Sequence, residues 1–202
     1  MFVSFDGVDG VGKSTQLELF CRWLESLGKT VVSCRDPGST PLGERVRDIV
    51  LHSDDATPIG GRAEMLLYMA ARAQLVEEVI RPALLAGSVV VADRFLLANV
   101  VYQAHAGGLP VDEVWQVGKV ATGGIEPDAT LLLDMDPAIA DGRIERTRDR
   151  METRGDDYRQ KVREGFLAEA ARSERIHVID ANQSIDDVQA DIRRAVEPLL
   201  DA

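Results

Sequence analysis

The stretch Gly7-Val8-Asp9-Gly10-Val11-Gly12-Lys13-Ser14 decides the fold, because it matches the pattern G-x-x-x-x-G-K-[ST] without a gap. Glycines let the backbone turn tightly and approach a phosphate closely. Successive N–H groups of such a loop form an anion site at the start of a helix. The lysine reaches the β- and γ-phosphates, and the next hydroxyl is placed to ligate Mg²⁺. We therefore expect residues 7–15, Thr15 included, to bind a nucleoside triphosphate.

The residues on both sides of this loop fit the prediction. Phe2-Val3-Ser4-Phe5 is a short apolar-rich run, as expected of a strand that leads into the loop. Apolar residues recur at helical spacing behind the loop, at Leu17, Phe20, Cys21, Leu24 and Leu27. Gly28 supplies a stop signal for that helix. The order strand, loop, helix is the context that this loop requires.

The rest of the chain alternates between short apolar runs and helical patterns. The runs predict strands at 2–6, 30–34, 88–92, 130–135 and 176–180. Helical patterns cover 13–27, 41–51, 59–86, 95–105, 111–121, 137–150, 157–173 and 183–199. This alternation predicts an α/β fold of the P-loop NTPase type, a five-stranded parallel sheet between two helix layers. Ligands bind such sheets at the carboxyl ends of the strands.

Length and composition restrict the class of protein further. The 202 residues predict one domain, and the net charge of -11 argues against a nucleic-acid partner. No run approaches the ~18 apolar residues that span a membrane. Cys21 and Cys34 are too few for a disulfide scaffold and are interpreted as buried thiols of a reducing compartment. We therefore expect a cytoplasmic protein that does not bind membranes.

The phosphate loop alone fits several classes of nucleotide-binding protein. A GTPase should carry an N-K-x-D motif, which this sequence lacks, and a motor ATPase is usually larger. Arginines crowd one stretch of the otherwise acidic chain, at Arg143, Arg146, Arg148, Arg150 and Arg154. Such a stretch is typical of a small kinase whose lid closes over phosphates and excludes water. We place this lid at residues 142–155.

Four segments downstream of the loop make the interpretation more specific. They are Arg35-Asp36-Pro37-Gly38-Ser39-Thr40, Leu66-Leu67-Tyr68-Met69-Ala70-Ala71-Arg72-Ala73-Gln74, Asp93-Arg94-Phe95 and Tyr102-Gln103. They resemble the R-E-P-G-G-T, L-x-F-x-A-x-R-x-Q and D-R-[YH] motifs of bacterial thymidylate kinases and the tyrosine–glutamine pair that follows. The resemblance covers essentially the whole chain. It implies a homodimer that transfers the γ-phosphoryl group of ATP to dTMP, with Mg²⁺ as cofactor.

The residues also suggest how a thymine nucleotide would be bound. Tyr68 offers a stacking surface for the base, and Arg72, one helical turn later, can donate to O4 of thymine. The resemblance places Asn99 at the base edge and Tyr102 under the sugar, and makes Gln103 part of the same site. The negative charge of Asp9 is unfavourable beside the phosphates that such a loop binds. The resemblance gives Asp9 the sugar 3′-hydroxyl or Mg²⁺ as a partner.

Charged residues are assigned to the two phosphate groups. Arg47 and Arg94 are expected to bind the monophosphate of the acceptor. Asp93 is expected to organise Mg²⁺, together with Ser14, or the acceptor phosphate. The catalytic residues are then Lys13, Arg94, Asp93 and one lid arginine, because charge on the transferring group must be neutralised. For the lid, Arg146 and Arg143 are the first choices, and Arg148 is the third.

Several positions depart from the family pattern. Asp6 and Asp36 each replace a usual glutamate, Ser39 a glycine, Phe95 a tyrosine or histidine, and Ala98 a serine that is often present. These changes bear on fine substrate selectivity and leave the reaction intact. Two other functions stay open: a deoxynucleoside kinase, which phosphorylates a hydroxyl and needs a catalytic carboxylate, and a nucleotide-binding regulatory protein without turnover.

Overall fold

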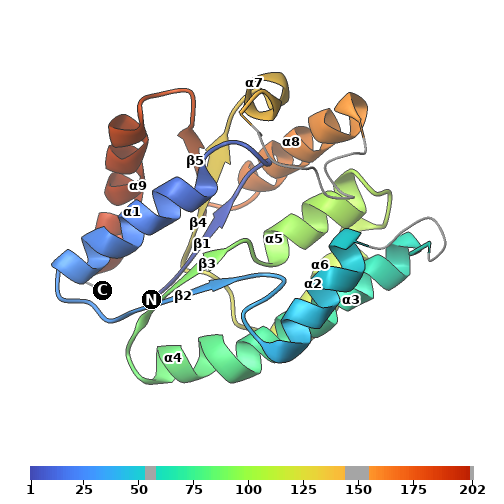
Figure 1. Ribbon diagram of the computed structural model, residues 1–202, viewed down its shortest axis with the longest axis horizontal. Helices are drawn as coiled ribbons and strands as arrows, with labels where there is room; N and C mark the ends of the chain where they lie inside the picture. Colours follow the sequence, from blue (N-terminus) through green and yellow to red (C-terminus); the bar gives the residue numbers. More distant parts are fainter. Residues whose placement is uncertain (53–57, 144–154, 201–202) are drawn as a thin grey trace.

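A five-stranded parallel sheet forms the centre of the computed structural model, which describes residues 1–52, 58–143 and 155–200 (Figure 1). The strands are β1 (Phe2–Asp6), β2 (Val31–Arg35), β3 (Val89–Asp93), β4 (Ala129–Asp134) and β5 (Ile176–Asp180). Their order in the sheet is β2-β3-β1-β4-β5, and all four neighbouring pairs are parallel. The predicted fold class is confirmed, and each predicted strand lies within one residue of its observed bounds.

Helices follow the strands in the predicted order. They are α1 (Lys13–Ser26), α2 (Pro41–His52), α3 (Gly61–Leu75), α4 (Arg81–Leu85), α5 (Leu96–Asn99), α6 (Val111–Thr122), α7 (Pro137–Asp141), α8 (Asp156–Ala170) and α9 (Ile185–Leu200). Two segments have the wider π-helical turn, η1 (Val76–Ile80) and η2 (Val100–His105). The helix predicted over 59–86 is therefore α3, η1 and α4 in succession, and that over 95–105 is α5 followed by η2.

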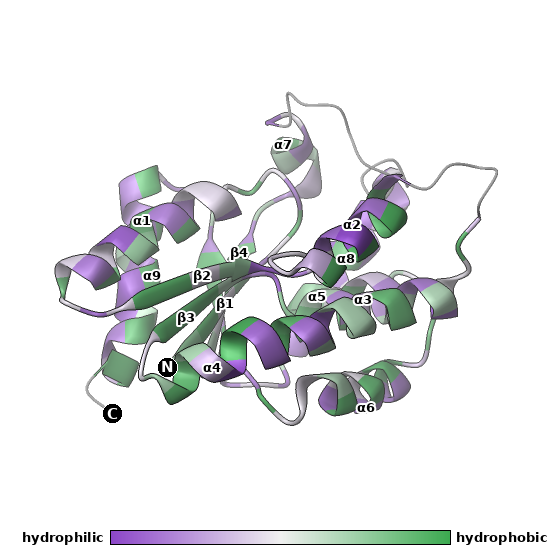
Figure 2. Ribbon diagram, turned by 60° about the horizontal axis from the view of Figure 1, so that its bottom comes forward, coloured by the Kyte–Doolittle hydropathy of each residue, from purple (hydrophilic) through white to green (hydrophobic). Residues whose placement is uncertain are grey.

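Apolar side chains on both faces of the sheet hold the helices in place. Phe5 points to the face covered by α1, where its ring lies 5.6 Å from that of Phe20. Phe2 faces the other way and meets Phe95 at 4.9 Å. Helices α1 and α9 lie on one side of the sheet, and α3, α5 and α6 on the other (Figure 1). Apolar residues cover the strands along their length, whereas the outer helices also carry hydrophilic residues (Figure 2). The three-layer arrangement follows from this burial on both faces.

The predicted helix over 137–150 is too long. Asp136 caps α7 by accepting from the Ala138 N–H at 2.9 Å, but this helix ends at Asp141. Gly142 and Arg143 form a turn, and residues 144–154 lie outside the described residues. Arg146, Arg148, Arg150 and Arg154 therefore fall outside the described part of the chain, together with most of the predicted lid.

Two further expectations can be compared with the structure. Cys34 is buried as expected, whereas Cys21 is only half-buried. Within the residues that the structure describes, no helix combines the length and hydropathy needed to cross a membrane.

Candidate active site

The phosphate loop connects β1 to α1 at the carboxyl edge of the sheet. Gly7 has φ +134°, and a Cβ added to it would lie 2.3 Å from the carbonyl oxygen of Leu133 at the end of β4. Only glycine fits there, because the main chain of the neighbouring strand occupies the space. Gly12, with φ +95°, precedes the first turn of α1, where Ser14 and Thr15 are exposed. Helix α1 therefore begins with its free N–H groups and both hydroxyls beside the loop.

Lys13 lies folded over the loop. Its Nζ donates to the carbonyl oxygens of Val8 at 2.8 Å and Gly7 at 3.2 Å, and forms an ion pair with Asp9 at 3.6 Å. Burial lowers the pKa of Lys13, and the charge of Arg94 adds to this effect, whereas nearby carboxylates oppose it. The ammonium group is thus held at the loop in a site poor in water, where its attraction for a phosphate is strong.

Arg94 connects the end of β3 to the same loop. Its backbone takes φ +66°, and its N–H donates to the carbonyl of Phe5 at 2.9 Å. The guanidinium donates to the Gly7 carbonyl at 2.9 Å and to Asp9 Oδ1 at 2.7 Å, and lies 5.1 Å from the ring centre of Tyr102. Asp9 therefore pairs with both Lys13 and Arg94, which accounts for a carboxylate inside a phosphate loop. The three residues were predicted separately, and the structure brings them together.

Two more carboxylates end the neighbouring strands β1 and β3. Asp6 is fully buried, and neither of its oxygens has a hydrogen-bond partner among the described residues. Burial raises its pKa to about 7, against the attraction of Arg94 and Lys13. Asp93 Oδ1 is likewise buried without a partner in the described part of the chain. We define Asp6, Asp9, Lys13, Asp93 and Arg94 as the phosphate cluster.

Arg47 and Tyr68 lie beyond this cluster, on α2 and α3. Arg47 is half-buried and donates to the carbonyl of Pro37 at 3.0 Å. Burial lowers the pKa of Arg47, while Asp93 and Tyr68 are close enough to act against that lowering. Tyr68 is half-buried and packs beside Val46 and other apolar residues of α2. The structure thus brings Arg47 and Tyr68 toward the same edge as Asp93.

Ser39 occupies a position where the family pattern has glycine. Its φ of +61° lies in the left-handed region that glycine adopts readily. The Ser39 hydroxyl accepts from the Arg35 N–H at 2.9 Å, and the Ser39 N–H donates to Glu44 Oε1 at 2.7 Å. These bonds hold the serine in a backbone conformation that glycine adopts readily.

Arg72 belongs to a chain of buried polar side chains. Its Nε donates to Asp36 Oδ2 at 2.6 Å and its Nη1 to Asn99 Oδ1 at 2.9 Å. Asn99 Nδ2 donates to Gln103 Oε1 at 2.6 Å, and Gln103 Nε2 donates to Glu64 Oε1 at 2.9 Å. All five side chains are buried. We call Asp36, Arg72, Asn99, Gln103 and Glu64 the amide chain.

The sequence prediction missed both ends of the amide chain. Asp36 was quoted only as part of a motif, and burial raises its pKa although the pair with Arg72 opposes this. Glu64 was not singled out. Its spacing was an available signal, because Glu64, Tyr68 and Arg72 are four residues apart and share one face of α3.

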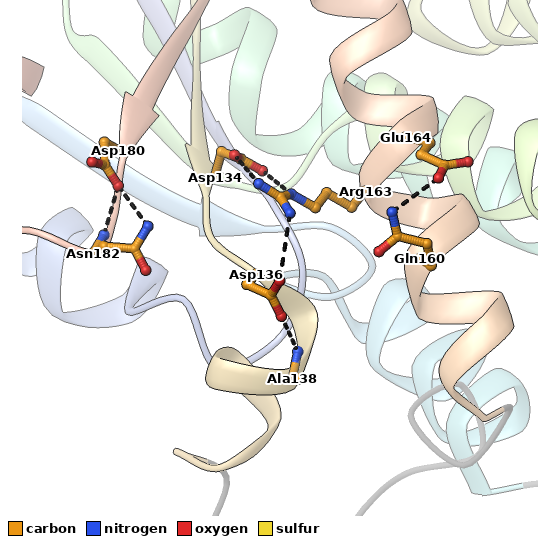
Figure 3. A network of polar contacts seen from close by, with 8 residues as sticks. All are labelled: Asp134, Asp136, Ala138, Gln160, Arg163, Glu164, Asp180 and Asn182. Carbon is orange, nitrogen blue, oxygen red and sulfur yellow. Dashed lines mark hydrogen bonds and ion pairs between the residues drawn. The ribbon is translucent and has the colours of Figure 1, made fainter.

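A third polar group lies at the ends of β4 and β5 (Figure 3). Arg163 of α8 donates to both oxygens of Asp134, from Nε and Nη2, each at 2.8 Å. Asp180 accepts from the backbone and side chain of Asn182. Arg163 was not predicted as a site residue, since the arginine stretch drew attention to 143–154. Arg143 is exposed, in the turn after α7.

Comparison with known proteins identifies the family to which this arrangement belongs. The family model described as thymidylate kinase matches residues 5–192. The chain belongs to the thymidylate kinase family. It is 48% identical over 203 residues to the thymidylate kinase of Bifidobacterium longum subsp. infantis, covering 99% of this chain and 87% of that protein. The thymidylate kinase of Symbiobacterium thermophilum is 44% identical, with 99% and 94% covered.

A solved thymidylate kinase agrees with the fold of the chain. The crystal structure of the thymidylate kinase from Ehrlichia chaffeensis aligns with a TM-score of 0.80 and 27% identity, covering 98% of each chain. The predicted resemblance to thymidylate kinases is therefore confirmed. The roles assigned to individual site residues stay predictions.

Proposed function

We propose that the phosphate cluster and the amide chain are two parts of one active site, which transfers the γ-phosphoryl group of ATP to dTMP. As a member of the thymidylate kinase family, the chain is an ATP-dependent nucleoside monophosphate kinase that forms dTDP for dTTP synthesis. The contact of Arg94 with the Gly7 carbonyl at 2.9 Å carries the proposal. It places an arginine suited to the acceptor phosphate against the loop suited to the donor.

The transfer needs alignment and neutralisation of charge more than proton removal. The attacking atom is an oxygen of the dTMP phosphate, which is already largely ionised at neutral pH, so no strong general base is required. Lys13 leaves the carbonyls of Gly7 and Val8 for the β- and γ-phosphates, and Arg94 and Arg47 bind the acceptor phosphate. Charges fixed in a buried site stabilise the charge that develops on the transferring group. In this proposal Asp9 stays paired with Lys13 and Arg94 and reaches the sugar of the acceptor.

The chain also has residues suited to Mg²⁺. A magnesium ion prefers oxygen ligands and keeps several waters, with one or two carboxylates from the protein. The exposed Ser14 hydroxyl and the partnerless Asp93 oxygen fit this preference, and the partnerless oxygens of Asp6 lie on the adjacent strand. Bound there, the ion would supply positive charge to the phosphates of the donor nucleotide.

The second part of the site, around the amide chain, binds the base and sugar of dTMP. Tyr68 stacks on thymine, while Arg72 and Asn99 contact its polar edge, supported by Gln103. Tyr102 lies under the sugar, since its ring is already fixed against Arg94. Aromatic stacking combined with buried donors is typical of sites that distinguish one base from another.

The remaining features of the proposal extend beyond the reaction centre. The chain forms one domain with a lid at 142–155, from which Arg146 or Arg143 adds charge to the transferring phosphoryl group. It acts in the cytoplasm as a homodimer and takes small nucleotides rather than nucleic acid as partners. The acidic net charge of -11 supports the last point, because nucleic-acid binding requires a basic surface.

An ADP-release assay with ATP, Mg²⁺ and different acceptors tests the proposed function. We expect turnover with dTMP and very little with thymidine, because thymidine leaves Arg47 and Arg94 in a closed site without the dianion that they bind. Efficient phosphorylation of thymidine would indicate the nucleoside kinase instead. A folded protein that binds ATP and phosphorylates none of dTMP, dUMP, dGMP and thymidine would indicate the regulatory protein.

A further inference from the structure

The wide turn η2 removes the α-helical hydrogen bond of the Tyr102 carbonyl. In an α-helix, the Ala106 N–H would donate to this carbonyl, which lies four residues back. It donates instead to the Val101 carbonyl at 2.9 Å, five residues back. Two later N–H groups donate to the carbonyls of Gln103 and Ala104. The main chain that follows η2 therefore bonds to the carbonyls on both sides of Tyr102, and the Tyr102 carbonyl loses its α-helical donor.

A hydroxyl group from α8 takes the place of that donor. Tyr158 Oη donates to the Tyr102 carbonyl at 2.9 Å, and the centres of the two rings lie 6.4 Å apart. A part-buried carbonyl without a donor is unfavourable. The Tyr158 hydroxyl therefore stabilises the wide turn relative to an α-helical turn, in which the carbonyl would be bonded to the main chain.

Helix α8 packs closely enough against η2 to make this bond, and it contacts the turn at two ends. A Cβ added to Gly165 would lie 2.7 Å from the Cβ of His105, so a larger residue would separate the two elements. Beyond Gly165, the buried Glu169 is hydrogen-bonded to His105 Nε2 at 2.7 Å and accepts from Trp115 Nε1 at 3.2 Å. One contact, at Tyr158, thus reaches a residue of the proposed site, whereas the contact at Glu169 reaches the far end of the turn.

The bond from Tyr158 bears more on Tyr102 than on its neighbour Gln103. The Tyr102 carbonyl belongs to a planar peptide group, so its bond restrains the main chain at both residues. The side chain of Gln103 is also held by two other members of the amide chain, at 2.6 and 2.9 Å. The Tyr102 hydroxyl, by contrast, accepts from Arg94 Nη2 at 3.3 Å. The orientation of the Tyr102 ring therefore depends more on its main chain.

We infer that Tyr158 is a positioning residue for the acceptor nucleotide, because its hydroxyl holds η2 in the wide turn that sets the Tyr102 ring against Arg94. The inference rests on the proposed function, in which Arg94 binds the acceptor phosphate and Tyr102 lies under the sugar. The Arg94 guanidinium lies 5.1 Å from the centre of the Tyr102 ring. A small displacement of this ring would misalign the acceptor, and phosphoryl transfer is sensitive to alignment. Tyr158 acts through Tyr102 and needs no contact with the nucleotide.

Three variants test this role. Tyr158→Phe removes one oxygen atom and keeps the ring. Glu169→Gln is a matched control, because it keeps the shape of the side chain and weakens the contacts between α8 and the far end of η2. Tyr102→Leu, alone and combined with Tyr158→Phe, tests whether the effect passes through the Tyr102 ring.

The readout is kcat and KM for dTMP and for ATP, with urea denaturation of every variant. For Tyr158→Phe, we expect kcat/KM for dTMP to fall about tenfold, the scale of one hydrogen bond. KM for ATP should stay unchanged, because neither Tyr158 nor Tyr102 belongs to the phosphate loop. Glu169→Gln should lower the free energy of unfolding and leave kcat/KM for dTMP as in wild type. In Tyr102→Leu, adding Tyr158→Phe should lower kcat/KM by less than about twofold, because the ring through which it acts is absent.

Three results would overturn the inference while the wild-type protein phosphorylates dTMP. They are an unchanged kcat/KM for dTMP in folded Tyr158→Phe, an equal loss in Glu169→Gln, and a full loss from Tyr158→Phe in the Tyr102→Leu background. If Glu169→Gln does not fold, Trp115→Phe is the control, since it removes only the indole donor to Glu169. If Tyr102→Leu does not fold, the first two results decide. Wild-type protein without turnover of dTMP would overturn the proposed function itself.

Discussion

The phosphate cluster and the amide chain lie at the same edge of the sheet but are built in opposite ways. In the phosphate cluster, Lys13 and Arg94 donate to loop carbonyls, and the oxygens of Asp6 have no partner among the described residues. In the amide chain, each link joins two side chains at 2.6 to 2.9 Å. In the proposed function, the first arrangement holds charge available to phosphates and Mg²⁺, and the second holds a fixed pattern of donors and acceptors for the base.

This difference between the phosphate cluster and the amide chain predicts which kind of substitution each region tolerates. The links of this buried network stabilise one arrangement, although Asp36 Oδ1 has no partner among the described residues, and the loss of one member leaves its neighbours without partners. In a cluster of exchangeable charges, the loss of one contact affects folding less and turnover more. We therefore expect substitutions in the amide chain to reduce stability and selectivity, and substitutions in the phosphate cluster to reduce turnover.

The largest effect on stability is expected from Asp36→Ala. This change leaves the Arg72 guanidinium buried without its ion pair, and breaking a buried pair costs roughly 3–5 kcal/mol. Urea denaturation of wild type and variant measures the difference. Glu126→Ala serves as a control, because Glu126 pairs with Arg175 at 3.4 Å where both are exposed. A loss at Asp36 no larger than that of the control would contradict a buried chain that depends on this pair.

Lys13→Ala tests the phosphate cluster, the other region of the comparison. We expect kcat to fall on the order of a hundredfold or more, as on removal of an electrostatic stabiliser of the transition state, with far less effect on the free energy of unfolding. Steady-state kinetics and urea denaturation on the same preparation measure both. Turnover near that of wild type in a folded variant would remove Lys13 from the catalytic residues.

Arg72→Lys should have a smaller and more selective effect. A lysine keeps the charge but cannot donate in the planar geometry that serves Asp36 and Asn99 together. We expect kcat/KM for dTMP to fall about tenfold, corresponding to the ~1.4 kcal/mol of one buried hydrogen bond, while KM for ATP changes little. Equal losses for both nucleotides would show that Arg72 supports the fold without reading the base.

The smallest effect concerns Asp6 and the pH dependence of stability. The pKa of Asp6 is raised to about 7 in the folded protein. The folded state therefore holds a proton that the unfolded chain has lost between its ordinary pKa and pH 7, so stability falls as the pH rises through this window. From pH 6 to pH 8 this amounts to about 1 kcal/mol. Thermal melting of wild type and Asp6→Asn should show a decline in wild type that the variant lacks. Parallel curves would exclude this titration.

The sequence was sufficient for the fold and for the phosphate loop, because both depend on local patterns. Gly7 to Ser14 is contiguous, and each strand is a short apolar run between helical patterns. The partners of Arg72 were beyond such reasoning, since Asp36 lies 36 residues away and meets it only through the fold. The resemblance named Asn99 and Gln103 as site residues but not the hydrogen bonds that orient them. For Asp9, the motif showed an unfavourable charge, and its pairing with both Lys13 and Arg94 required the structure.

The wide turn η2 bears on how relatives of this chain should be compared. Ala106 N–H donates to the Val101 carbonyl five residues back, so this turn holds one residue more than an α-helical turn. Within η2, Tyr102 meets Arg94 and Gln103 meets Glu64. Loss of one residue here would rotate the following side chains by about 100°. A homologue with a one-residue gap between Asn99 and His105 can thus match every motif and still lose one of these contacts. When relatives are aligned with this chain, the number of residues across this turn is therefore as informative as the identity of those residues.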